Sequence, residues 1–276
     1  MRIGFIGAGK AGNSLARHFA RHNIDLSGFY SKTDEHAIQA ADYTKSAAFF
    51  TIKQVVEKSD IIFITTPDGK ISKIWEEIRD MELSEKTIVH CSGSLSSQVF
   101  TGGQRICSAH PMMAISKKDT DLTQGVFTLE GEPQAVDEVG KILKKCGNQV
   151  EVISKESKTK YHCAASIASN LMIALSQMSI RSMEECGFSQ ETSIKMLGPL
   201  MKANMDNLIN LGPAKALTGP VERSDIQTVQ KHLDVLSEGD REIYRLLSIK
   251  LVDVAKEKNI DRDYSLLKNI LEEERK

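Results

Sequence analysis

Short apolar runs alternate with amphipathic stretches over the first 153 residues. The runs are rich in β-branched and aromatic residues and cover 2–6, 25–30, 60–65, 87–91, 104–109, 126–129 and 150–153. Helical patterns separate most of them. Near-continuous apolar strands joined by helices are typical of parallel sheets buried on both faces. The pattern therefore predicts an α/β domain with a doubly wound, mostly parallel sheet.

From residue 158 the hydrophobic period becomes helical and stays so. One long helix is expected over 158–186, and its apolar stripe, spaced for burial, comprises Ala164, Ala168, Leu171, Leu175 and Met178. Further helices are expected from Ser189, interrupted at Gly198-Pro199, then over 225–236 and 240–258, followed by a polar tail. The chain thus predicts two domains, an α/β domain over residues 1–153 and an all-helical C-terminal domain over 154–276.

Composition narrows the classes of protein. The 276 residues are 41% hydrophobic and 26% charged, with a formal net charge of -1. This balance is globular, and it lacks the basic excess of a nucleic-acid or membrane-surface binder. We expect no membrane span and no signal peptide. The five cysteines show no zinc-type spacing, so we expect reduced thiols, no metal and a cytoplasmic location.

A glycine motif lies between the first expected strand and the helix that follows. Gly7, Gly9 and Gly12 have the spacing G-x-G-x-x-G. In this context the first glycine permits a tight turn, the second admits a pyrophosphate, and the third allows close helix–strand packing. The helix N-terminus offers unpaired N–H groups to the phosphates. The motif predicts a Rossmann-type dinucleotide site formed by Gly7, Ala8, Gly9, Lys10, Ala11 and Gly12.

The end of the second expected strand bears on the choice between NADP and NAD. An NAD site usually places Asp or Glu there for the ribose hydroxyls. This sequence has Ser31 and Lys32 instead, whose hydroxyl and ammonium suit a 2′-phosphate. We therefore expect NADP rather than NAD. Two alternatives stay open: Ser31 caps the next helix, or Asp34 reaches the ribose.

Reactive side chains follow three further expected strands. Thr66 and Pro67 are expected beside the nicotinamide, Ser92 in substrate binding, and His110 in catalysis. Ligands of open α/β sheets bind beyond the carboxyl ends of the strands. Because imidazole titrates near neutral pH, His110 is the candidate for the proton that accompanies hydride transfer. The alternative for His110 is a structural hydrogen bond in a turn.

Polar residues interrupt the long apolar helix at regular spacing. His162, Ser166 and Asn170 are four residues apart and lie along one helical stripe. We expect His162 and Asn170 to act in catalysis and Ser166 to bind substrate; hydrogen bonds between helices are the alternative. Arg223, in a polar loop of the helical domain, is a candidate ligand for a substrate carboxylate. The alternative for Arg223 is a solvated side chain beside a helix cap.

These motifs follow one another in a single order along the chain. The set comprises 7–12, Thr66-Pro67-Asp68, His90-Cys91-Ser92-Gly93, His110-Pro111, the stretch 161–170, and Thr218-Gly219-Pro220 with Arg223 and Asp225. In this order they resemble the Rossmann-like NADP oxidoreductases with a helical C-terminal domain of unknown function, in the superfamily of 6-phosphogluconate dehydrogenase and ketopantoate reductase. The resemblance implies an NADP site, a substrate cleft between the domains, and a homodimer paired through the helical domains.

Differences from the sequence motifs of better-known relatives exclude specific substrates. Ketopantoate reductases carry a Lys and two Asn four residues apart on the corresponding helix, whereas the stripe from His162 to Asn170 has the spacing without the Lys. The reaction expected is hydride transfer to or from a small polar carbonyl, imine or hydroxy acid. The alternative function is a non-catalytic sensor or regulator that binds NADP(H).

Overall fold

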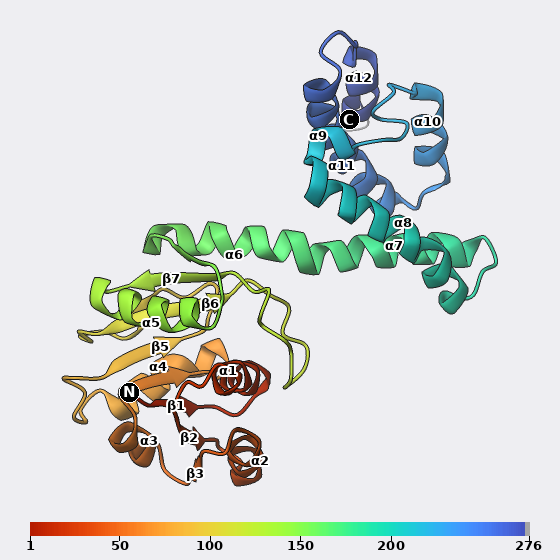
Figure 1. Cartoon of the computed structure of the whole chain (residues 1–276). Coiled ribbons are helices and arrows are strands. Elements are labelled where there is room, and N and C mark those ends of the chain that lie inside the picture. The colour runs from red at the N-terminus through yellow and green to blue at the C-terminus, as the bar shows by residue number, and fades with distance from the viewer. Residues whose placement is uncertain (274–276) are drawn as a thin grey trace. The chain divides into compact units, whose positions relative to one another are not determined.

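The computed structural model describes residues 1–273 (Figure 1). The chain divides into two compact units, Met1–Leu171 and Met172–Lys276. Residues 154–171 thus belong with the sheet, whereas the domain boundary expected from the sequence lies after residue 153. That boundary stays a prediction, and the two units are described separately below.

An eight-stranded sheet forms the first unit. Its strands are β1 Ile3–Ile6, β2 Leu26–Tyr30, β3 Ala47–Phe49, β4 Ile61–Ile64, β5 Thr87–His90, β6 Ile106–Pro111, β7 Phe127–Gly131 and β8 Val150–Val152. Their order is β3-β2-β1-β4-β5-β6-β7-β8, and neighbouring strands are parallel except β6 and β7. The order reverses direction between β1 and β4, which is where such sheets bind ligands. The predicted fold class is confirmed.

Helices pack against both faces of this sheet (Figure 1). The main ones are α1 Lys10–Arg21, α2 Asp34–Thr44, α3 Ile52–Lys58, α4 Asp68–Ile78 and α5 Pro133–Lys145. Successive strand residues alternate between the faces. Phe63 belongs to the core under α1, α2 and α5, whereas its neighbour Ile62 belongs to the core under α3 and α4. The continuous apolar runs of the sequence follow from this two-sided burial.

The long helix expected over 158–186 is confirmed in extent but not in regularity. It comprises α6 Lys158–Ser166, a π-helical segment Ile167–Leu171 and α7 Met172–Glu185. The expected burial of its apolar stripe is wrong for the single chain, where Leu171 is 53% exposed and Leu175 38%. Helical spacing predicts which side chains share a face, but it does not say whether the same chain supplies the covering layer.

The second unit is helical, as predicted. After α7 come α8 Gln190–Leu211, α9 Pro213–Ala216, α10 Ile226–Val235, α11 Glu238–Lys258 and α12 Ser265–Glu273. Pro199 lies inside α8 without ending it, contrary to the expected interruption. The polar tail expectation is also wrong, because Leu267 and Leu271 of α12 are fully buried in the core of this unit.

One helical stretch, Lys155–Glu185, is long and apolar enough in composition to cross a membrane, with a mean hydropathy of 1.4 in its most apolar window. No part of that window is buried. The expectation of no membrane span therefore stays a prediction. Length and composition alone are weak evidence for a membrane span, since core helices of soluble proteins meet the same criteria.

Candidate active site

The glycine motif forms a tight turn at the carboxyl end of β1. Gly7 has φ +117°, a conformation that favours glycine, and its carbonyl accepts a hydrogen bond of 2.7 Å from Thr65 Oγ1. A Cβ on Gly12 would overlap the carbonyl oxygen of Gly7. Both observations agree with the roles predicted for the first and third glycines. The turn brings α1 close against the ends of β1 and β4.

The N-terminus of α1 fits a diphosphate. Gly9 is the N-cap, has no side-chain cap hydrogen bond, and would have nothing within 4 Å of an added Cβ. The first turn also contains no acidic residue, so the positive end of the helix dipole is not offset locally. Of the other predicted contact residues, Ala8 is buried, Ala11 is half-buried and Lys10 is exposed. Open backbone and an uncapped helix end are what an anionic group needs.

Thr66 and Pro67 lie where β4 passes into α4. Pro67 is the N-cap of α4. The Oγ1 atom of Thr66 is buried and has no hydrogen-bond partner among the described residues. Because buried polar atoms are almost always paired, this hydroxyl fits a site that a polar ligand completes. The residues present therefore fit a dinucleotide.

The segment after β2 excludes one of the two alternatives left open by the sequence. The N-cap of α2 is Thr33, with no side-chain cap bond, so Ser31 does not cap that helix. Ser31 is half-buried and Lys32 is exposed. Both side chains follow directly after the carboxyl end of β2. A role in binding a 2′-phosphate stays a prediction for these residues.

His110 is held by a chain of hydroxyl groups. Thr128 Oγ1 donates to the Tyr161 hydroxyl at 2.7 Å, and that hydroxyl lies 2.8 Å from His110 Nδ1. Burial, aided by the charge of Lys158, lowers the pKa of His110 to about 4. His110 is therefore neutral at pH 7. With Tyr161 donating to Nδ1, the second nitrogen Nε2 carries the proton.

Gly93 provides a bare backbone surface between two imidazole rings. A Cβ on Gly93 would lie 2.9 Å from His110 Nε2 and 2.5 Å from His162 Cδ2. The two rings meet edge to face, with centroids 6.2 Å apart. His110 comes from β6, His162 from α6 and Gly93 from the loop after β5. The structure thus brings His110 and His162 together, and their catalytic roles stay a prediction.

Lys158 is a residue of this site to which the sequence analysis assigned no role. It begins α6, is 2% exposed, and donates from Nζ to Ser92 O at 2.9 Å and to Ser108 Oγ at 2.5 Å. Burial lowers the pKa of its ammonium group. Lys158 precedes His162 by four residues and so begins the very stripe that was described as lacking a lysine. The four-residue spacing between Lys158 and His162 was the sequence signal that could have identified this lysine.

The hydroxyl of Ser92 is already engaged. It donates to Asp68 Oδ2 at 2.7 Å and accepts from the backbone N–H of Leu95 at 3.0 Å. The pair places a carboxylate, which the sequence analysis did not single out, beside the ends of β4 and β5. Neighbouring His90 is fully buried, with Nε2 3.2 Å from Ser96 O. His90 therefore has a structural role, whereas the substrate role of Ser92 stays a prediction.

Three further predicted residues lie outside the histidine pair. Ser166 and Asn170 lie farther along the long helix than His162, and Arg223 lies in the second unit. Ser166 ends α6 half-buried, and Asn170 is exposed in the π-helical segment, where Oδ1 accepts from Ser169 Oγ at 2.8 Å. No hydrogen bond joins either of them to His110 within residues 1–273. In the second unit, Asp225 caps α10 and Arg223 is exposed. The catalytic role of Asn170 and the substrate-binding roles of Ser166 and Arg223 stay predictions.

Two family models match the chain. Residues 2–93 match a family described as NADP oxidoreductase, coenzyme F420-dependent, and residues 125–251 match a domain of unknown function, DUF2520. No curated protein matches. The matches cover the glycine motif at one end and the stripe from Lys158 to Asn170 with Arg223 at the other.

Solved structures share the fold over nearly the whole chain. A protein from Thermotoga maritima is 28% identical, with a TM-score of 0.76 over 93% of this chain and 99% of that chain. A candidate NADP oxidoreductase from Bacteroides fragilis is 22% identical, with a TM-score of 0.74 over 91% and 98%. A reductive aminase from Aspergillus terreus in complex with NADPH is 14% identical, with a TM-score of 0.63 over 99% and 92%. Pyrroline carboxylate and imine reductases match at 16% identity.

The two family models agree with the predicted resemblance to NADP oxidoreductases that carry a helical C-terminal domain of unknown function. NADP, the cofactor expected from the sequence, is named by the model that matches residues 2–93 and by the titles of structural relatives. The comparisons do not identify the substrate. The chain is therefore similar to the NADP oxidoreductase family over residues 2–93 and to the DUF2520 family over residues 125–251.

Proposed function

We propose that this protein transfers hydride between NADP(H) and a small polar substrate with a C=O or C=N group. The observation that carries the proposal is the pair of imidazoles, His110 and His162, against the bare backbone of Gly93. Gly93 follows the carboxyl end of β5, His110 lies near the carboxyl end of β6, and His162 comes from α6. This is the edge of the sheet at which α/β enzymes bind their ligands.

The cofactor would be held mainly by backbone groups. Residues from Gly7 to Gly12 and the N-terminus of α1 would bind the diphosphate, Ser31 and Lys32 the 2′-phosphate, and Thr66 with Pro67 the nicotinamide end. NADPH supplies the hydride when it is bound. Thr66 Oγ1, which is buried with no hydrogen-bond partner among residues 1–273, would gain one from the ligand.

His110 is the proposed hydrogen-bond donor to the substrate's oxygen or nitrogen. Tyr161 donates to Nδ1, which leaves Nε2–H on the side of Gly93. A neutral imidazole can stabilise negative charge that develops on the substrate heteroatom without carrying charge itself. If Nε2 gives its proton to an alkoxide product, the Tyr161 hydroxyl would give its own proton to Nδ1, and water would return a proton to the half-buried Tyr161 oxygen, which Thr128 Oγ1 holds in place.

The remaining walls of the site are polar and charged. His162 faces His110, and Ser166 with Asn170 continue the same stripe; we propose that they orient the substrate. Asp68, bonded to Ser92, would favour a cationic iminium group, whereas His110 would favour a carbonyl oxygen. The imine class also draws support from the names of the structural relatives, which include imine reductases and a reductive aminase.

The test is NADPH oxidation by the purified chain, followed by absorbance, against 2-oxo acids, cyclic imines and ketone–amine mixtures. We expect turnover with one of these classes and a loss of about 100-fold or more in His110→Ala, the range of general acid–base contributions. His232→Ala, an exposed histidine of α10, is the matched control. NADPH binding without turnover across the panel would instead support the sensor function. Full activity in both His110→Ala and His162→Ala would refute the site.

We also propose a cytoplasmic homodimer formed through the helical unit. Large apolar side chains are exposed on α7 and α8, among them Ile173 at 69%, Leu200 at 59% and Ile209 at 76%. Exposed apolar patches of this kind mark surfaces that a partner covers. Light scattering after size exclusion should give twice the 30.6 kDa mass of the chain. A monomer that instead partitions into detergent would favour a membrane contact.

A further inference from the structure

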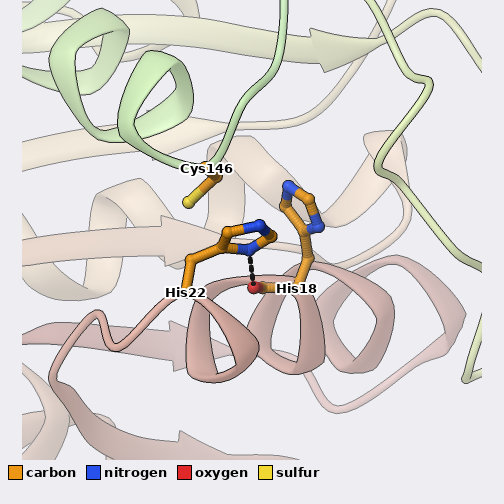
Figure 2. A group of neighbouring side chains, drawn as sticks. All are labelled: His18, His22 and Cys146. Carbon is orange, nitrogen blue, oxygen red and sulfur yellow. Dashed lines mark hydrogen bonds between the residues drawn. The ribbon is translucent and has the colours of Figure 1, made fainter.

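A histidine–cysteine cluster lies at the far end of α1 from the glycine motif. His18 and His22 are four residues apart on α1, and Cys146 follows the end of α5 (Figure 2). One potential ligand atom from each residue lies within 4.8 Å of the other two. The cluster is separated from Gly9 by most of the twelve-residue helix, roughly 15 Å at 1.5 Å per residue. It is therefore distinct from the proposed cofactor and substrate sites.

His22 is in the tautomer that a metal ligand requires. Its Nδ1 lies 2.8 Å from the carbonyl oxygen of His18, the contact drawn in Figure 2. Because a carbonyl only accepts, Nδ1 must carry the proton, and the unshared electron pair is on Nε2. Metal-binding histidines characteristically donate their other ring nitrogen to a carbonyl in this way. His22 is half-buried, so a cation has access to the cluster from its side.

His18 has one nitrogen that the protein leaves unpaired. Its Nε2 lies 2.6 Å from Asn148 Oδ1, and Asn148 Nδ2 donates to the carbonyls of Leu122 and Gly125. The Asn148 amide is thereby oriented, and Nε2 of His18 is the donor. Nδ1 of His18 is buried with no hydrogen-bond partner in the described part of the chain. A cation can be bound through Nδ1 with the Asn148 bond kept, or through Nε2 in its place.

Cys146 supplies the group that selects the metal. Its side chain is 1% exposed, and burial raises the pKa of the thiol to about 11. A thiol that binds a transition metal loses its proton, and the cation offsets the charge of the thiolate. Two imidazoles with one thiolate favour Zn²⁺ over Mg²⁺ or Ca²⁺, which prefer oxygen. Zinc bonds of about 2.0–2.3 Å would require side-chain rotations that draw the ligand atoms closer.

We propose that His18, His22 and Cys146 form a zinc site that ties the end of α1 to the end of α5. Water or Asn148 Oδ1 would complete the coordination. The site would stabilise the packing of α1, the helix that carries the dinucleotide-binding turn. This proposal does not depend on the proposed reaction, because the cluster contains none of its residues.

The experiment uses the full chain after treatment with a chelator. Calorimetric titration with Zn²⁺ should show one equivalent bound per chain, and Co²⁺ should give a thiolate-to-cobalt absorption band. Cys146→Ser should abolish that band. His22→Ala, whose side chain is half-buried and can be removed with little effect on packing, should weaken Zn²⁺ binding by more than the about 10–100-fold typical of outer-shell partners. Zn²⁺ should also raise the melting temperature of the wild type but not that of Cys146→Ser or His22→Ala.

Cys186→Ser is the matched control, because Cys186 is an exposed thiol of the second unit. It should bind Zn²⁺ like the wild type. The absence of stoichiometric binding to the wild type would overturn the proposal. So would binding that persists unchanged in both His22→Ala and Cys146→Ser, since it would place the cation elsewhere.

Discussion

The hydroxyl of Tyr161 lies 2.8 Å from Nδ1 of His110, and the two rings are perpendicular. These residues are 51 positions apart in the sequence, one on α6 and the other at the end of β6. The contact assigns a tautomer to His110, since Tyr161 receives a hydrogen bond from Thr128 and so gives its own proton to Nδ1. The proposed catalytic imidazole is therefore oriented by the first turn of α6.

Tyr161→Phe should lower kcat without changing the affinity for NADPH. The ring remains, but Nδ1 loses its donor, and the imidazole can then adopt the tautomer that turns a lone pair toward Gly93. We expect a decrease of about 10-fold, equivalent to about 1.4 kcal/mol. Steady-state kinetics and NADPH titration measure the two effects. Tyr43→Phe, on α2, is the control, and an unchanged kcat in Tyr161→Phe would show that the tautomer does not matter.

Gly93→Ala should abolish turnover while leaving NADPH binding intact. The added methyl group would lie 2.5 Å from His162 Cδ2 and 2.9 Å from His110 Nε2, so it would displace both rings and fill the space between them. The glycine turn proposed to bind the diphosphate follows β1, a different strand from the one before Gly93. Gly239→Ala, at a position with nothing within 4 Å, is the matched control. Wild-type kcat in Gly93→Ala would exclude a substrate from this space.

Lys158→Met should move the acidic limb of the pH–rate profile to higher pH. The charge of Lys158 is the second cause, after burial, of the lowered pKa of His110. Removing that charge lets His110 take up a proton more easily, so the profile should shift even if kcat at neutral pH is little changed. A residue with a purely structural role would lower the rate without shifting the profile. Lys155→Met, an exposed lysine just before α6, should leave it in place.

The long helix shows which features of the site the sequence predicts and which it does not. Period and spacing identified the helix and the stripe of His162, Ser166 and Asn170, because these depend on neighbours one turn away. The π-helical segment Ile167–Leu171 and the burial of Lys158 were not predicted. The partners of Lys158 are Ser92 and Ser108, which lie 66 and 50 residues away. No local pattern encodes contacts of that kind.

The limits of local sequence patterns also explain why β3 and the histidine–cysteine cluster were not predicted. Strand β3, only Ala47–Phe49, is too short to show an alternation. The apolar run 61–64, in contrast, reads directly as a strand buried on both faces. The spacing of His18 and His22 was visible, but Cys146, more than 120 residues later, joins them only through the packing of α5. Local periodicity therefore predicts the elements and one face of the site, and tertiary packing decides the rest.

Lys32→Ala should raise KM for NADPH and leave KM for NADH unchanged. An ammonium on a phosphate is a charge-assisted contact worth about 1.5–3 kcal/mol, which corresponds to roughly 10-fold or more in affinity. NADH has no 2′-phosphate and would not lose this contact. Lys53→Ala, an exposed lysine on α3, is the control. Equal changes for the two cofactors would show that Lys32 does not bind the 2′-phosphate.

His90 makes the first unit sensitive to acid. The side chain is fully buried, and burial lowers its pKa to about 4, below its ordinary value of 6.5. Between these values the unfolded chain binds a proton that the folded chain does not. The free energy of unfolding must therefore fall as the pH drops from about 6.5 to 4, by on the order of 3 kcal/mol.

His90→Asn should flatten this dependence, because an amide oxygen can accept the Ser92 N–H bond of 3.2 Å but does not titrate. His110 also has a pKa of about 4 and keeps its share of the acid sensitivity, so the slope should decrease without vanishing. Urea unfolding at pH 7.5 and pH 5 measures this dependence of the free energy of unfolding on pH. Trp75, the single tryptophan, packs on Phe100, which also contacts His90, so its fluorescence follows this region. An unchanged slope in His90→Asn, equal to that of the control His232→Asn, would mean that His90 is already protonated in the folded protein.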